Sequence, residues 1–119
     1  MNENSKQYDL EDRTFLFAKN VSLYIKKFSR TISIIEYGKQ VVRASGSVGA
    51  NYIEANEALS KKDFIMRIKI CRKEAKESAY WLRLIVETNS EKYTVDGNKL
   101  FKEATELKKI FSSILEKSK

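Results

Sequence analysis

The amino-acid sequence predicts an all-α protein with the architecture of an antiparallel up-and-down four-helix bundle. Long segments place apolar residues at alternating steps of three and four, which is the spacing of one helix face. The 119 residues contain no proline that would interrupt a helix. Because long helices joined by short connections pack antiparallel, we expect a single domain over residues 1–119.

The first helix is expected at about residues 11–29, with Asp9 as a candidate N-cap. Its apolar stripe consists of Ala18, Val21, Ile25 and Phe28, widened by Phe15, Phe17 and Tyr24. The second helix is expected at about residues 31–59, with apolar positions at Ile34, Ile35, Val41, Val42, Val48, Tyr52 and Ile53.

The third helix, expected at residues 61–88, has the clearest start signal. Ser60 and Asp63 form a capping box, in which the serine side chain caps the first turn. Steps of four and three then connect Phe64, Ile68, Cys71, Ala75, Ser78, Leu82 and Ile85. The segment TVDGN is expected to be a turn, with Thr94 or Asp96 capping a fourth helix at about 97–117. The same steps connect Leu100, Ala104, Leu107, Phe111 and Ile114.

Small residues gather in the middle of the second helix, in the segment RASGSVGAN. Each of Gly38, Gly46 and Gly49 costs a helix about 1 kcal/mol relative to alanine. A compensating close approach of another backbone is therefore expected, since small side chains permit it. The alternative is a kink or a break of the helix between Ser45 and Gly49.

A row of polar residues follows one side of the same helix, at Gln40, Arg43, Ser47, Asn51 and Glu54. Such a row is ordinarily a solvated face. Because it contains no lysine and adjoins the small residues, we expect a buried or interfacial hydrogen-bonded row. An unpaired buried charge is very costly, so Arg43 should have a carboxylate partner.

Composition excludes several classes of function. There is no histidine, which removes most general bases, most nucleophilic triads and most transition-metal sites. Carboxylates such as Glu54, Glu57, Glu74 and Glu77 suit Mg²⁺, but nothing in the sequence forces them together. We therefore expect neither an enzyme nor a cofactor. Cys71 is the only cysteine, so no intrachain disulfide forms. Neither a signal segment nor a membrane span is visible, and we expect a cytoplasmic protein.

The formal charge of +7, from 23 basic and 16 acidic residues, favours an anionic partner, with nucleic acid first. Lys62, Lys69, Lys76 and Arg83 are spaced seven apart and form a basic stripe on the third helix, with Arg72 and Lys73 beside it. The stripe could follow a phosphate backbone. The alternative is a solvated face that Glu74 and Glu77 partly neutralise. Tyr80 and Trp81 lie near its end, where packing is a more usual role than base stacking.

The segments GKQVVRASGSVGANYIEANEAL, KKDF and CRKEAKESAYWLRL resemble the four helix bundle protein family, also called the 23S rRNA-intervening-sequence protein family. The family's polar pattern falls on Gln40, Arg43, Ser47, Asn51, Glu54 and, in the third helix, Glu77. The chain departs from many members at Gly49, where they have proline, and at Ala55, where they have glycine.

The resemblance implies a ring-shaped homopentamer and kinship with the accessory protein of diversity-generating retroelements, which works with a reverse transcriptase and RNA. In such a ring, Gln40, Arg43, Asn51, Glu54 and Glu77 would form a polar network within or between subunits. We expect a non-catalytic protein that binds RNA or DNA through its basic helix surfaces. The alternative is a structural adaptor for a protein partner such as a reverse transcriptase.

Overall fold

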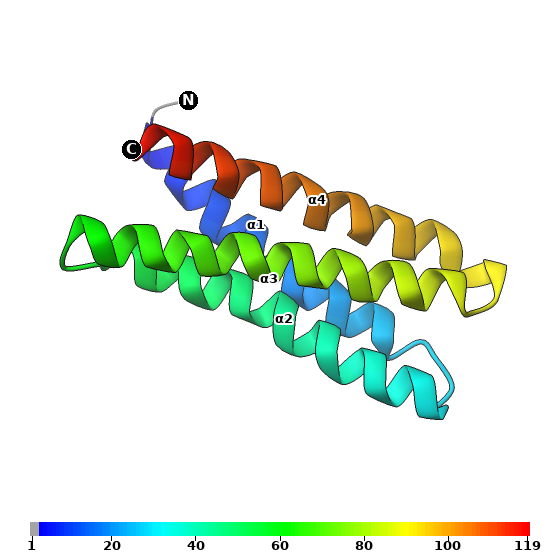
Figure 1. Ribbon diagram of the computed structural model, residues 1–119. Coiled ribbons are helices and arrows are strands. Elements are labelled where there is room, and N and C mark those ends of the chain that lie inside the picture. Colours follow the sequence, from blue (N-terminus) through cyan, green and yellow to red (C-terminus); the bar gives the residue numbers. More distant parts are fainter. Residues whose placement is uncertain (1–2) are drawn as a thin grey trace.

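The computed structural model describes residues 3–119, with side chains from Leu10 onward, and this range is helical without strands. It contains α1 (Glu3–Ile25), α2 (Ile32–Asn56), α3 (Lys61–Glu87) and α4 (Thr94–Lys117), with a short 3₁₀ helix, η1 (Glu91–Tyr93), before α4. Successive α-helices run in opposite directions (Figure 1). The α2–α3 connection therefore lies at one end of the bundle, and the other two connections lie at the opposite end.

The central helix in Figure 1 is α3, which packs extensively against both α2 and α4. Helix α1 lies on the far side of that view and packs mainly on α2, with a smaller contact on α4. All four helices contribute apolar side chains to one core. Its largest fully buried members include Phe17, Val41, Val48, Ile68, Leu82, Leu107 and Phe111.

Helix α1 differs from the prediction in both its bounds and its buried face. It begins at Glu3, so Asp9 lies within the helix and is not its N-cap, and it ends at Ile25. The buried line is Thr14, Phe17, Val21 and Tyr24, whereas Phe15 is 66% exposed. Two overlapping apolar stripes are available here, and the observed one removes two aromatic rings from water.

Helix α2 is continuous from Ile32 to Asn56, so the predicted alternative of a break between residues 45 and 49 is wrong. Its N-cap is Thr31, whose Oγ1 accepts a hydrogen bond of 3.2 Å from the Ile34 amide. Val42 and Ile53, expected on the apolar face, are exposed. Small residues take the core positions instead, namely Gly38, Ala44, Ser45 and Ala55.

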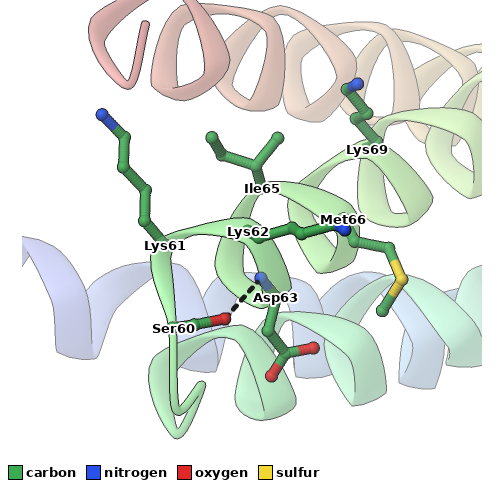
Figure 2. A pocket seen from close by; sticks show the side chains of 7 residues that line it. All are labelled: Ser60, Lys61, Lys62, Asp63, Ile65, Met66 and Lys69. Atoms are coloured by element: carbon green, nitrogen blue, oxygen red, sulfur yellow. Dashed lines mark hydrogen bonds between the residues drawn. The ribbon is translucent and has the colours of Figure 1, made fainter.

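Helix α3 follows the prediction closely. The Ser60 side chain accepts a hydrogen bond of 3.1 Å from the Asp63 amide, which confirms the N-cap (Figure 2). The helix ends at Glu87, one residue before the predicted end. The apolar seam from Ile68 to Ile85 is buried as predicted, and Phe64 is half-buried. The Cys71 thiol donates to the Val48 carbonyl oxygen at 3.4 Å, and burial raises its pKa to about 12.

Helix α4 begins at Thr94, so the expected turn at TVDGN is in fact its first turn. Gly97 is buried in this turn, so tightly that a Cβ at this position would clash with Val86 Cγ2 and Tyr24 Oη. The Tyr24 hydroxyl donates a hydrogen bond of 2.9 Å to the Tyr93 carbonyl oxygen. The glycine therefore provides space for a tyrosine that ties α1 to the start of α4, and the predicted seam is buried at Ala104, Leu107 and Phe111.

Candidate functional site

Two of the three glycines in α2 serve the close packing of α2 on α1. A Cβ at Gly49 would lie 3.1 Å from Thr14 Oγ1, and a Cβ at Gly38 would lie 3.1 Å from Ile25 Cγ2. Gly46 is different, because it is exposed and a Cβ there would meet no atom within 4 Å. The structure of one chain thus explains Gly38 and Gly49 but gives no reason for Gly46.

Arg43 of α2 bridges two carboxylates of α3, as its predicted need for a carboxylate partner required. Its Nη1 donates to Glu74 Oε2 at 3.2 Å, and its Nη2 donates to Glu77 Oε2 at 2.8 Å. These bonds raise the pKa of Arg43. Burial raises the pKa of Glu74, whereas hydrogen bonding to Glu74 and to Arg43 lowers the pKa of Glu77.

The remaining polar row of α2 divides into separate contacts. Asn51 donates to the Ser47 carbonyl oxygen at 2.9 Å, and its Oδ1 accepts a hydrogen bond of 3.0 Å from Arg67 of α3. Gln40 is half-buried and Glu54 is exposed, and neither bonds to Arg43 in the part of the chain that the structure describes. The structure thus brings Arg43, Glu74 and Glu77 together, with Asn51 and Arg67 as a second α2–α3 pair.

The basic stripe of α3 lies on the outer surface. Lys62, Lys69, Lys76 and Arg83 are all exposed, and helix rise places the first about 30 Å from the last. Arg83 pairs with Glu87 at 2.9 Å. Among the described residues, the three lysines form no ion pair within 4.0 Å. Of the two neighbours, Lys73 is exposed on the same face and Arg72 is half-buried.

At its N-terminal end the stripe borders an open hollow of about 730 Å³ (Figure 2). Lys61, Lys62 and Lys69 line it together with the apolar side chains of Ile65 and Met66. Lys61 and Met66 were not among the predicted site residues. Both residues could have been found from the sequence. Met66 lies four residues after Lys62 and three before Lys69, on the same helix face, and Lys61 directly follows the Ser60 cap.

Comparisons with known proteins show which family this helical chain belongs to. A family model described as 23S rRNA-intervening sequence protein matches residues 6–113. The chain belongs to this family. The expected family resemblance is thereby confirmed over nearly the whole chain.

A solved structure provides a three-dimensional comparison. It is a protein of unknown function from the S23 ribosomal protein family of Bacteroides thetaiotaomicron VPI-5482. The two chains are 32% identical, with a TM-score of 0.73 over 88% of this chain and 96% of that chain. No curated protein matches the chain. The comparison therefore supports the fold, and the exposed residues of the chain provide the evidence for its function.

Two kinds of feature are absent from the described residues. No helix among them is long and apolar enough to cross a membrane. Likewise, no group of three or more His, Cys, Asp or Glu side chains within the same range is placed to hold a metal ion. The carboxylates of α2 and α3 are spread out, and Glu74 and Glu77 are engaged with Arg43.

Proposed function

We propose that this protein is a non-catalytic, homo-oligomeric protein that binds RNA or DNA through the basic stripe of α3. The observation that carries the proposal is the exposure of the stripe along the length of α3. Exposed lysine ammonium groups on one straight face attract phosphates at regular intervals and with little dependence on base sequence. The lysine-lined hollow extends this surface around the start of α3.

The charge balance of the whole chain supports the same proposal. The excess of positive charge draws a polyanion toward the surface and speeds its encounter with the stripe. Lys73 adds a cation to the face, while Glu77 is held by Arg43 on the α2 side of the helix. The family's description and that of the similar structure mention rRNA and a ribosomal protein, which agrees with an RNA ligand.

Assembly of several copies is the second part of the proposal. Val42, Gly46 and Ile53 share one exposed face of α2, and Phe15 lies beside Thr14, in the turn of α1 that packs on Gly49. Apolar side chains in this arrangement, around a glycine with no contact of its own, fit a second copy of the chain. Five copies is the number that the family resemblance implies. Repetition around a ring would multiply the weak affinity of each stripe.

The proposal assigns no reaction to the protein. Histidine is absent, and Arg43 engages Glu74 and Glu77. The Arg43 contacts instead fix α2 against α3, which keeps the two helices in register beneath the stripe.

The test measures mass and binding on the same sample. Light scattering gives the molar mass, and fluorescence anisotropy gives the affinity for labelled RNA and DNA at ~50 and ~200 mM salt. We expect an oligomer, pentameric by the family resemblance, whose affinity falls about 100-fold between these salt concentrations if five phosphates of a single strand are neutralised.

A matched pair of variants locates the binding surface. Lys69→Glu/Lys76→Glu on α3 should abolish most of the affinity. Lys102→Glu/Lys109→Glu, with the same spacing and charge change on exposed positions of α4, should retain it. Equal losses would mean that only overall charge matters and that the stripe is not the site. An oligomer without affinity at either salt concentration would favour the alternative function, an adaptor for a protein partner. A monomer would contradict the proposed assembly.

A further inference from the structure

We propose that Tyr80 stacks on an unpaired base and that the ligand of the stripe is therefore a single-stranded nucleic acid. This inference rests on the proposed function, which it makes more specific. Tyr80 lies four residues after Lys76 and three before Arg83. Those steps place it on the same outward face as the stripe, directly between two of its cations.

Exposure separates Tyr80 from the other tyrosines whose side chains are described. Tyr80 is 58% exposed, whereas Tyr24 and Tyr52 are buried and Tyr37 and Tyr93 are half-buried. An exposed aromatic ring among lysines gains nothing from the core of the bundle. Single-stranded nucleic acid is the ligand class that uses such rings, because each unpaired base offers a flat face.

The ring of Tyr80 also has a firm support on one side. It meets Trp81 edge to face, with ring centroids 5.1 Å apart and an interplanar angle of 78°. Trp81 in turn packs against Tyr37 of α2 at 5.8 Å. Because this cluster restrains the ring before any ligand arrives, stacking costs little side-chain entropy.

Beside the ring there is space for a flat group. A hollow of about 200 Å³ is lined by Tyr80, Arg83, Leu84 and Glu87. Arg83 bonds to Glu87 through its Nε at 2.9 Å, which orients the guanidinium plane at the edge of this hollow. Arginine planes stack on bases as tyrosine rings do, so Tyr80 and Arg83 together provide two such surfaces. In a duplex, bases are already stacked on each other and cannot reach these surfaces.

The test compares Tyr80→Ala with Tyr80→Phe, using labelled oligouridylate and oligoadenylate single strands, an RNA duplex of equal length and an abasic strand. Tyr80→Ala should weaken binding of the base-bearing single strands about tenfold and leave duplex and abasic binding unchanged. Tyr80→Phe should retain wild-type affinity. The salt dependence should stay constant in Tyr80→Ala, because stacking involves no counterion release, whereas Lys76→Glu should flatten it.

The outcomes separate this inference from the proposed function. Unchanged single-strand affinity in Tyr80→Ala, together with loss in Lys69→Glu/Lys76→Glu, would overturn the stacking role and leave the stripe as the binding site. No binding of any probe by the wild-type protein would overturn both. A change of molar mass in Tyr80→Ala, measured by light scattering, would assign the tyrosine to a contact between copies and also overturn the proposal.

Discussion

Thr14 of α1 lies directly over the bare backbone of Gly49 of α2, so that a Cβ at position 49 would stand 3.1 Å from its Oγ1. Thr14 is almost fully buried, and its hydroxyl donates to the Glu11 carbonyl oxygen at 3.0 Å. It therefore cannot move aside cheaply. The contact explains why α2 has glycine at this point, since the side chain of Thr14 occupies the space that a Cβ would need.

This contact predicts a non-additive pair of substitutions. Gly49→Ala gains about 1 kcal/mol of helix propensity but loses about 1–3 kcal/mol to overpacking, so it should not stabilise the wild-type chain. In a Thr14→Ala background the closest atom, Oγ1, is absent, and Gly49→Ala should then be more favourable by about 1 kcal/mol. Urea unfolding followed by circular dichroism measures the four free energies of unfolding. Additive values would show that the contact does not limit residue 49.

Gly97 is more tightly enclosed by its neighbours than Gly49. A Cβ there would clash with Val86 Cγ2 and with Tyr24 Oη, and both neighbours belong to the buried junction of α1, α3 and α4. Gly97→Ala should lower the free energy of unfolding by about 1–3 kcal/mol despite the better helix propensity of alanine. Asn98→Ala, at the exposed next position, should stay within about 0.5 kcal/mol of wild type. Similar behaviour of the two variants would disprove the steric explanation.

Arg43 predicts a pH-dependent variant. Arg43→Ala removes the cation beside the largely buried Glu74 and should cost about 1–3 kcal/mol near pH 7. Burial already raises the pKa of Glu74, and losing Arg43 raises it further. The folded variant then binds a proton more readily than the unfolded chain, so its stability should rise as the pH falls below 7.

Unfolding experiments at pH 7 and at pH 5 measure this recovery relative to wild type. Glu74→Gln in the Arg43→Ala background supplies the control, because a neutral side chain should remove most of the penalty at both pH values. A penalty that stays constant with pH would mean that Glu74 is not the group left uncompensated.

The buried hydroxyl and thiol predict a loss of stability in alkali. Burial raises the pKa of Cys71 from 9.0 and that of Tyr24 from 10.0, each to about 12. Between those values the unfolded chain releases protons that the folded chain retains. The free energy of unfolding should therefore fall as pH rises above about 9, by up to about 1.4 kcal/mol per pH unit for each group. Tyr24→Phe should flatten this slope above pH 10.

The predictions from sequence were accurate for α3 and for the apolar seam of α4, because both seams are uninterrupted and the Ser60 cap is a local interaction. The start of α4 was placed three residues too late, because TVDGN resembles a turn. The predictions were less accurate for α1 and α2, where the buried face is chosen by packing. In α2 the core positions hold Gly38 and Ser45, while Val42 and Ile53 face outward. A pattern based on apolar residues places such a face wrongly, because small side chains are buried for their size.

For the candidate site, spacing alone predicted that the stripe would share one face of α3. It also indicated that Arg43 needs an acidic partner, since a charge near a packed seam is costly. It did not show that Glu74 joins Glu77, because the register of α2 against α3 depends on packing. The sequence favoured packing over base stacking as the role of Tyr80, because its exposure is visible only in the folded chain.

The reactivity of Cys71 toward a thiol reagent reports the opening of the bundle. The only thiol of the chain lies in the seam between α2 and α3 and is closed off from solvent by the helix whose Val48 carbonyl it bonds. A thiol reagent can reach it only when these two helices separate, so the rate of labelling reports how often they do. A ligand that binds the outer face of α3 and holds the helices together would slow the labelling of Cys71. This change in rate can be measured without attaching any probe to the protein surface.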